Sequence, residues 1–446
     1  TWRGVDPTIL LRLYKALIRS RLEYRGFLFH PLSSKTLKKL TAIQNQALRV
    51  AMGYRQSTPI NVMLAEAKDP PIYLRYQYLC MNFLTRMLSN SEHPITLLLD
   101  KLVANRDNSL LVTRGPRPLL LVACEDLIPI QHYIASTDKP WCYAYSYESL
   151  WFVPDVDLDC GISIQESKNP NSKFESLFRQ ELIRGNCWFT DGSKIPEQEF
   201  VGFASVNVSA GAIETCRTVK YASIFTAEAM AIYTTLEKFF QNNEHHFNIF
   251  SDSKSVLIAL KNYIKPEKQK PIIHVIKDQL QRLSLMNKKV KFYWIPAHMG
   301  IEYNEMVDKT AKESALIGID SHILIPASDL KAIWKVKIKN KFNLWCCNTG
   351  KDKGKNYFNK YWTEGASPWF KNFTFCRKTI VSINRLRSGH TSLAASLFRF
   401  KIVNSDQCSS GEAVEEPNHV FWQCKLYDKA REYLITDLIK AKIFPP

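Results

Sequence analysis

Four acidic residues in the middle of the chain stand at positions from which their carboxylates can converge: Asp191, Glu228, Asp252 and Asp308. Asp191 and Asp252 each follow a short apolar run that is typical of a strand, so both are expected at strand ends. Glu228 lies in the first turns of a predicted helix, and Asp308 lies in a later one. Two acids at strand ends and two on helices that cover the same sheet can meet in space.

Carboxylates gathered in one place repel each other, so such a group is stable mainly when divalent cations neutralise it. A ligand set made only of oxygen atoms selects Mg²⁺ or Mn²⁺. Two such ions, about 3.5–4 Å apart, can hold both the attacking water and the leaving oxygen of a phosphodiester. Each acid taken singly is ordinarily a turn, cap or helix-dipole residue. The prediction therefore depends on the set.

The elements that must position these acids form one pattern. A strand is expected to begin at Cys187, and three others are expected at 201–208, 213–219 and 290–295. A fifth, short strand is expected at 248–251. Helices are expected at about 226–241, 253–263, 271–286 and 301–316. The predicted fold class is α/β: a five-stranded mixed sheet with helices on both faces, between mostly α-helical N- and C-terminal regions.

Five motifs in order resemble the type 1 RNase H domain of non-LTR retrotransposons of the jockey and I-like kinds. The matching segments are Phe189-Thr190-Asp191-Gly192-Ser193-Lys194, Thr226-Ala227-Glu228-Ala229, Ser251-Asp252-Ser253, Trp294-Ile295-Pro296-Ala297-His298-Met299-Gly300-Ile301 and Asn304-Glu305-Met306-Val307-Asp308. The resemblance implies an RNase H-like fold that cuts the RNA strand of an RNA–DNA hybrid with two Mg²⁺ or Mn²⁺ ions.

The resemblance also implies roles for single residues. Asp191, Glu228, Asp252 and Asp308 would be the metal-binding acids, and His298 would assist proton transfer, which suits a group that titrates near neutrality. Gly192, Ser193 and Asn304 are candidates for substrate contact.

Two departures from the family pattern flank the acids. Tyr303 stands where Gly is usual, and Met299 replaces a smaller or more polar residue. Both put the loop geometry and the rate in question, but not the ligand set. The short connection between 286 and 290 leaves little room for the basic protrusion that cellular RNases H use to hold substrate.

Basic residues are concentrated on both sides of this domain. Residues 1–60 contain 11 Lys and Arg but 2 Asp and Glu, and residues 331–400 contain 15 and 2, in a chain of net charge +18. These flanks suit phosphate backbones, although solvated basic helices explain them as well. Three segments stand within residues 10–90: Leu13 to Tyr24, Ile43 to Arg49, and Ser57-Thr58-Pro59-Ile60. Through them, residues 10–90 resemble the thumb of the reverse transcriptase of the same elements. The polymerase signature Tyr-x-Asp-Asp is missing, so no polymerase activity is expected.

Near the C-terminus, Cys408, His419 and Cys424 resemble a terminal zinc knuckle. The family pattern puts a second Cys near Ser410, and serine is a poor zinc ligand. Zinc binding is therefore doubtful, and a cysteine and histidine packed in a small helical cap is the alternative.

The predicted domains are 1–105, thumb-like; 106–182, an irregular connection; 183–320, RNase H; and 321–446, a basic helical region with the degenerate knuckle. The 11 scattered cysteines indicate a reducing, intracellular compartment, and the resemblance favours the nucleus. No apolar run reaches the length of a membrane span. The chain begins at Thr1 and reads as a fragment of a longer polyprotein whose polymerase part is its missing partner.

The leading hypothesis is thus an endoribonuclease that acts on RNA–DNA hybrids. The first alternative is a catalytically inactive or co-opted remnant that binds nucleic acid through its basic flanks. A second is another nuclease with a related fold, such as a Holliday junction resolvase or an integrase. These lack the combined Thr-Asp-Gly-Ser and Ala-His-x-Gly pattern.

Overall fold

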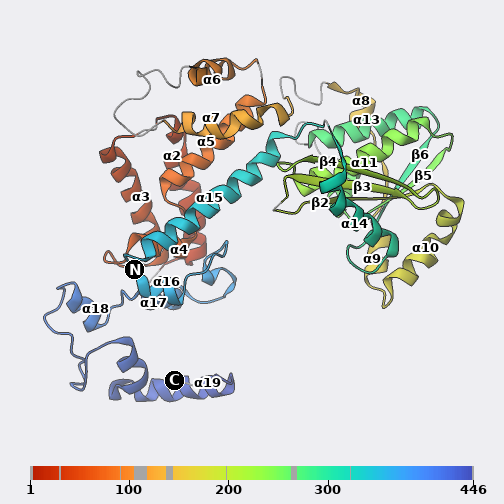
Figure 1. The fold of residues 1–446 in the computed structure, drawn as a ribbon. Helices are drawn as coiled ribbons and strands as arrows, with labels where there is room; N and C mark the ends of the chain where they lie inside the picture. Colours follow the sequence, from red (N-terminus) through yellow and green to blue (C-terminus); the bar gives the residue numbers. More distant parts are fainter. Residues whose placement is uncertain are drawn as a thin grey trace. The chain divides into compact units, whose positions relative to one another are not determined.

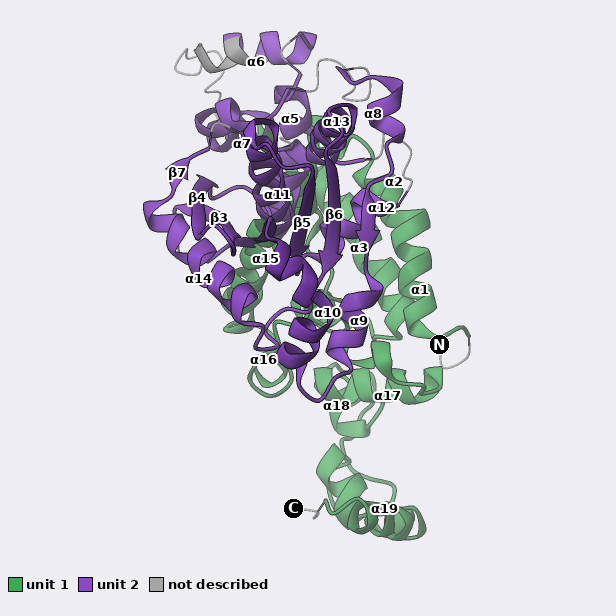
Figure 2. Ribbon diagram, turned by 90° about the vertical axis from the view of Figure 1, so that its right-hand side faces the viewer, with its two compact units in different colours: residues 1–80, 115–119, 336–446 green, residues 81–114, 120–335 purple. Residues whose placement is uncertain are grey.

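The structure is a computed structural model that describes residues 4–29, 32–90, 92–104, 118–136, 144–196, 198–262, 269–321 and 323–443. The chain divides into two compact units (Figure 2). Unit 1 comprises residues 1–80, 115–119 and 336–446, and unit 2 comprises residues 81–114 and 120–335. All four predicted metal-binding acids belong to unit 2.

Unit 2 contains a seven-stranded sheet with the order β1-β6-β5-β2-β3-β4-β7. Its strands are β1 (Asp155–Asp157), β2 (Cys187–Ser193), β3 (Phe200–Asn207), β4 (Ala212–Val219), β5 (His246–Ser251), β6 (Lys289–Trp294) and β7 (Ile319–Asp320). β2, β3 and β4 form an antiparallel meander, and β5 and β6 join it in parallel. The predicted mixed sheet is confirmed, but its predicted number of five strands is wrong. The two added strands are only three and two residues long, which is too short for a pattern of alternating polarity.

Helices cover both faces of this sheet (Figure 1). The helices of this part are α7 (Leu119–Leu127), α8 (Tyr147–Trp151), α9 (Asp159–Gln165), α10 (Pro170–Arg184), α11 (Ile224–Gln241), α12 (Lys254–Lys261), α13 (Pro271–Leu285) and α14 (Glu302–Ile317), with the 3-10 helix η3 (Ile128–Tyr133). Alternation along β2 turns Phe189 toward a core shared with α9, α10 and α14. Trp188 faces the other way and contacts Phe239 of α11.

Residues 144–182, expected as an irregular connection, contain regular elements that complete this core. Phe174 and Phe178 of α10 are buried, and their rings lie 5.5 and 4.9 Å from that of Phe250. β1 pairs in parallel with β6 at the sheet edge. The predicted connection also includes residues 106–117 and 137–143, which lie outside the described residues.

Unit 1 is helical, as expected for both flanks. Its elements are α1 (Pro7–Leu13), η1 (Tyr14–Arg19), α2 (Ser20–Glu23), η2 (Gly26–Phe29), α3 (Ser34–Met52), α4 (Ile60–Ala67), α16 (Lys355–Lys360), η6 (Trp369–Asn372), α17 (Arg377–Ser388), α18 (Ala394–Arg399), η7 (His419–Gln423), η8 (Lys425–Tyr427) and α19 (Asp428–Lys440). Two long helices, α5 (Ile72–Leu88) and α15 (Ala327–Gly350), contribute residues to both units, and α6 (Pro94–Ala104) belongs to unit 2.

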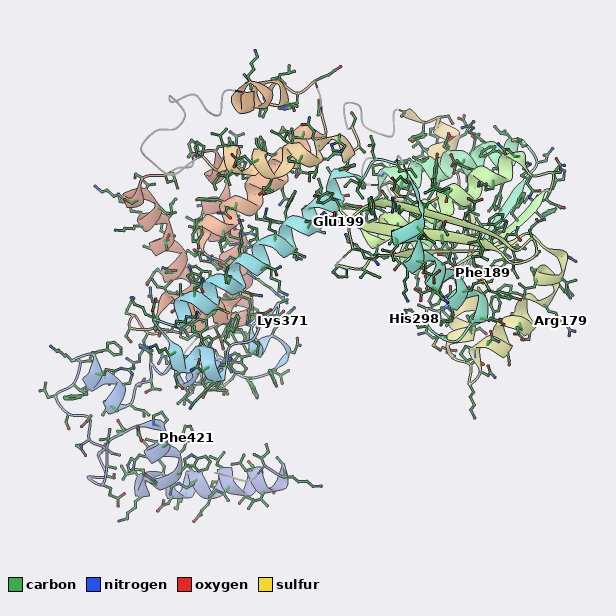
Figure 3. The ribbon with its side chains drawn as sticks, viewed as in Figure 1. Arg179, Phe189, Glu199, His298, Lys371 and Phe421 are labelled. Atoms are coloured by element: carbon green, nitrogen blue, oxygen red, sulfur yellow. The ribbon has the colours of Figure 1, made fainter. Side chains whose placement is uncertain are left out.

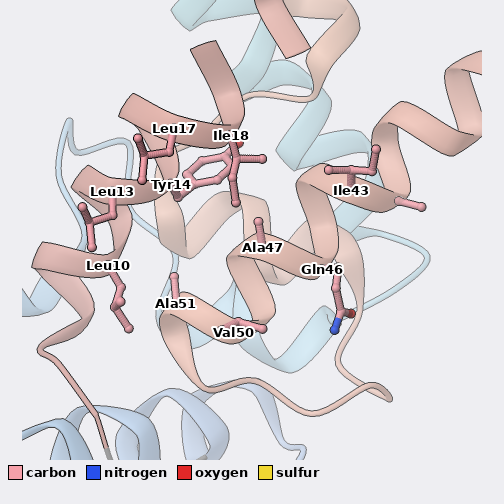
Figure 4. A pocket seen from close by; sticks show the side chains of 11 residues that line it. Leu10, Leu13, Tyr14, Leu17, Ile18, Ile43, Gln46, Ala47, Val50 and Ala51 are labelled. Carbon is pink, nitrogen blue, oxygen red and sulfur yellow. The ribbon is translucent and has the colours of Figure 1, made fainter. Parts of the chain in front are cut away.

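Residues from α1, α3, α4 and α5 pack with α15, α16 and α17 in the core of unit 1. Asp69 is fully buried there and accepts hydrogen bonds from Tyr14, Arg19 and Gln44. A groove of about 630 Å³ lies between the α1–η1 helix and α3, lined almost wholly by apolar side chains such as Leu13, Leu17 and Val50 (Figure 4).

Candidate active site

Three of the four predicted acids converge at one end of β2 and β5. One carboxylate oxygen from each of Asp191, Glu228 and Asp252 lies within 4.8 Å of those from the other two. Thr190 and Ser251 are paired across the parallel strands, so the next residue of each chain segment brings Asp191 and Asp252 together. Asp191 and Glu228 are 5% and 7% exposed, so the cluster is largely removed from water.

Glu228 reaches the cluster because Gly192 has no side chain. A Cβ atom at Gly192 would lie 2.6 Å from the backbone nitrogen of Glu228 and 2.9 Å from the Cβ atom of Ala227. Such distances are shorter than van der Waals contact. Asp191 therefore places one carboxylate of the cluster at the end of β2, and Gly192 leaves the space in which α11 approaches that strand.

The cluster strongly disfavours three simultaneous negative charges. Burial, with the charges of Asp252 and Asp308, raises the pKa of Asp191 to about 7. Burial and the charges of Asp191 and Asp252 raise the pKa of Glu228 well above its ordinary value. The pKa of Asp252 is also raised by burial, against a hydrogen bond from Asn304 that lowers it.

Asp308 belongs to an adjoining group on α14. The side chains of His298, Glu305 and Asp308 lie within 4.8 Å of one another. His298 is exposed, has a φ of 52° and lies in the loop between β6 and α14 (Figure 3). Lys312, one turn after Asp308, donates a hydrogen bond of 2.5 Å to its Oδ2 atom. The structure thus brings the predicted histidine and fourth acid together and adds two residues with no predicted role.

Sequence reasoning missed Glu305 and Lys312, although their spacing held a signal. They are three residues before and four residues after Asp308, so both lie on the same face of α14 as Asp308. Glu305 also lies within the matching segment that ends at Asp308.

The three residues predicted to contact substrate, Gly192, Ser193 and Asn304, are buried beside the acids. Gly192 and Ser193 are buried at the end of β2. Asn304 is 2% exposed, and its Nδ2 atom lies 3.4 Å from Oδ2 of Asp252. Substrate contact by any of the three stays a prediction. Tyr303, one of the two departures, packs its ring 5.4 Å from that of Phe189.

Trp294 supports Asp252 from the end of β6. Its indole Nε1 donates to the Asp252 carbonyl oxygen at 3.1 Å, and the Lys254 ammonium lies 4.0 Å from the centroid of its ring. Gly161 of α9 fits against the indole, because a Cβ atom there would lie 2.3 Å from Trp294 Cε3. The support for Asp252 thus includes a helix from the predicted connection.

Cys408, His419 and Cys424 also come together, in unit 1. Their ligand atoms lie within 4.8 Å of one another, and all three residues are buried. The two sulfur atoms are 3.6 Å apart, and the Ser410 hydroxyl lies 3.4 Å from Nε2 of His419. Hydrogen bonding from Ser410 is the main cause that lowers the pKa of Cys408 to about 7. The Ser410 hydroxyl thus lies beside the Cys408, His419 and Cys424 cluster.

No helix in the part of the chain that the structure describes combines the length and the apolar character needed to cross a membrane. No curated protein matches the chain. The RNase H family matches residues 184–316, a segment that begins just before β2 and ends in the last turn of α14. The matched segment contains all four acids and His298. Residues 184–316 are therefore an RNase H domain, a member of a nuclease family.

Proposed function

We propose that this chain hydrolyses the RNA strand of RNA–DNA hybrids. The observation that carries the proposal is the convergence of Asp191, Glu228 and Asp252 at the end of two parallel strands in an RNase H domain. RNase H domains bind such hybrids, and no residue of the acidic set is replaced in this sequence.

The side chains fit divalent cations. Oε2 of Glu228 is buried and accepts no hydrogen bond from the described residues, so it has a free lone pair for a cation. The donor set is all oxygen, which suits Mg²⁺ or Mn²⁺. Asp191, Glu228, Asp252 and Asp308 would hold two ions, which would supply charge neutralisation and a nucleophilic water at neutral pH.

Other side chains of this protein would orient the metal-binding acids and transfer protons. Asn304 and Trp294 hold Asp252 through its side chain and its carbonyl oxygen, respectively. His298 is exposed beside Glu305 and Asp308, so it can exchange a proton with the leaving oxygen and with solvent. Glu305 can accept a hydrogen bond from the imidazolium form of His298.

Assignments that concern the whole chain rest on its resemblance to retrotransposon proteins. We propose that the chain is part of a retrotransposon polyprotein, that residues 1–105 correspond to a reverse-transcriptase thumb and that the basic flanks contact duplex backbones. A domain boundary near 183 is part of the same proposal. The alternative function, binding without cleavage, is favoured by those flanks and by Ser410 in the knuckle-like cluster.

A second site is proposed at Cys408, His419 and Cys424. Their convergence favours a zinc ion of low affinity, because three ligands and a serine hydroxyl replace the usual four. Competition with a chromophoric chelator measures the affinity. A Cys424→Ser variant with unchanged zinc uptake would contradict the site.

The test of the main function compares substrates. Labelled RNA–DNA hybrid, single-stranded RNA, duplex DNA and a four-way DNA junction are each incubated with the full chain and Mg²⁺ or Mn²⁺. The proposal predicts cleavage confined to the RNA strand of the hybrid. Cleavage of the DNA-only substrates would favour a resolvase- or integrase-like activity, and hybrid binding without cleavage would favour the inactive alternative.

A further inference from the structure

The first turn of α15 places a buried carboxylate against the start of α11, the helix that carries Glu228. Asp329 is 3% exposed. Its Oδ2 atom accepts hydrogen bonds from the backbone nitrogen of Ser223, at 2.8 Å, and from Oγ1 of Thr226, at 2.5 Å. Because one donor is in the N-cap residue and the other is in the first turn of α11, Asp329 caps this helix from outside it.

This cap adds to one that α11 already has. Ser223 is the N-cap residue, and its hydroxyl accepts a hydrogen bond of 3.2 Å from the backbone nitrogen of Thr226. The carboxylate of Asp329 also interacts favourably with the positive end of the helix dipole. Glu228 follows Thr226 by two residues, so movement of this turn moves the carboxylate of Glu228.

The strand that carries Asp191 is tied to the same place. Lys194 follows the end of β2, and its ammonium donates a hydrogen bond of 2.6 Å to the carbonyl oxygen of Ala222. Burial lowers the pKa of Lys194, and the negative charge of Asp329 opposes that effect. It opposes the lowered pKa of Lys270 in the same way. The negative charge of Asp329 thus balances the positive charges of Lys194 and Lys270 near the junction of β2 and α11.

We propose that Asp329 is a positioning residue that holds α11 so that Glu228 meets Asp191 and Asp252. Asp329 lies beyond residue 316, where the match to the RNase H family ends. The active site of this protein thus depends on a helix outside the matched domain. The inference rests on the proposed function, since it takes Glu228 as a metal ligand.

The experiment uses the full chain and the variants Asp329→Ala and Asp329→Asn. Mn²⁺ affinity is measured by calorimetry, hydrogen exchange is measured for the amides of 223–228, and the kcat and KM of hybrid cleavage are measured. Glu199→Gln is the control, since it also removes one carboxylate charge, from an exposed residue paired with Lys220. All measurements are made at a temperature below the thermal unfolding midpoint of each variant. If Asp329→Ala does not fold, the Mn²⁺ affinity of Asp329→Asn tests the proposal in its place.

For Asp329→Ala we expect about 10-fold weaker Mn²⁺ binding, as for the loss of groups that orient metal ligands, with a similar fall in kcat and an unchanged KM. Exchange at 223–228 should be faster. Asp329→Asn keeps one acceptor oxygen and should recover part of the affinity, and Glu199→Gln should match the wild type.

Unchanged Mn²⁺ affinity in a folded Asp329→Ala variant would overturn the inference, even if exchange is faster, because the residue would then be structural only. If the wild type binds Mn²⁺ without cleaving hybrid, the proposed function fails, but a 10-fold affinity loss in the variant still supports positioning. If the wild type binds no Mn²⁺, the inference and the proposed function both fail.

Discussion

At the scale of single residues, the candidate site is a group of buried carboxylates. Bringing them together in charged form costs free energy of folding. Asp191 and Glu228 are buried beside each other and beside Asp252, with raised pKa values for all three. A cation bound there would recover this cost, which supports the proposal that the cluster holds metal ions.

This cost predicts how the stability of the metal-free protein depends on pH. The pKa of Asp191 is raised to about 7 in the folded protein, so folding favours its protonated form. The stabilisation is complete below the ordinary pKa near 4 and is lost as the pH rises through about 7. With a chelator present, the thermal midpoint should fall between pH 5 and 8, and less so for Asp191→Asn. Equal slopes for the two proteins would contradict the raised pKa.

Lys312 should compete with metal at Asp308. Its ammonium donates a hydrogen bond to Asp308 at about the place where a cation would bind, yet the Lys312 side chain is 49% exposed. Since exposed pairs contribute up to about 1 kcal/mol, Lys312→Met should lower the Mg²⁺ concentration for half-maximal hybrid cleavage by up to about fivefold. Lys309→Met is the matched control, because Lys309 lies on the same helix but pairs with Glu313. A higher Mg²⁺ requirement in Lys312→Met would show that Lys312 assists the site instead.

At the scale of elements, the strands and helices around the acids were predictable because their patterns are long. The eight-residue β3 and the eighteen-residue α11 both lie within two residues of their expected bounds. The edge strands β1 and β7 were not predictable, because two or three residues carry no period. Neither was the role of Asp329, because an acid in the first turn of a helix is ordinarily there for the dipole.

The close approach of α11 to β2 is the element-scale feature on which the site most depends. Gly192→Ala would place a Cβ atom 2.6 Å from the Glu228 backbone, so α11 must shift. We expect a loss of about 1–3 kcal/mol in the free energy of unfolding and a measurable fall in Mn²⁺ affinity. Gly365→Ala is the control, since its Cβ atom would meet nothing nearer than 3.7 Å. Unchanged stability and affinity in Gly192→Ala would mean that the strand and helix are less closely packed than described.

At the scale of the whole molecule, the packed unit that contains the RNase H domain extends beyond the segment that the family matches. Phe174, Phe178 and Ile164 precede residue 184 but belong to the core beneath β2 and β5. On the other side, Ile325 pairs with Ile134, and Asp329 caps α11. The motifs located the acids, but they carry no information about these supports, because large apolar residues in helices fit any core.

A fragment of residues 184–316 should therefore be unstable. Loss of a buried phenylalanine costs about 3–5 kcal/mol, and this fragment loses both Phe174 and Phe178. That sum is comparable to the whole stability of a typical domain. Circular dichroism and limited proteolysis should show a fragment of residues 118–335 folded and the shorter one unfolded or partly folded. A cooperative unfolding transition of equal midpoint in both fragments would contradict this prediction.

Cleavage of a labelled RNA–DNA hybrid by the full chain and its Asp252→Asn variant, with Mg²⁺ or Mn²⁺, tests most directly whether the acidic cluster is an active site. Asp437→Asn, at an exposed acid of α19, controls for the lost charge. We predict that the wild type and Asp437→Asn cut the RNA strand alike, and that Asp252→Asn is at least about 100-fold slower, since a direct ligand matters more than its supports. A folded wild type that binds the hybrid without cutting it, or an Asp252→Asn variant that cuts at the wild-type rate, would contradict the proposed role of the acidic cluster.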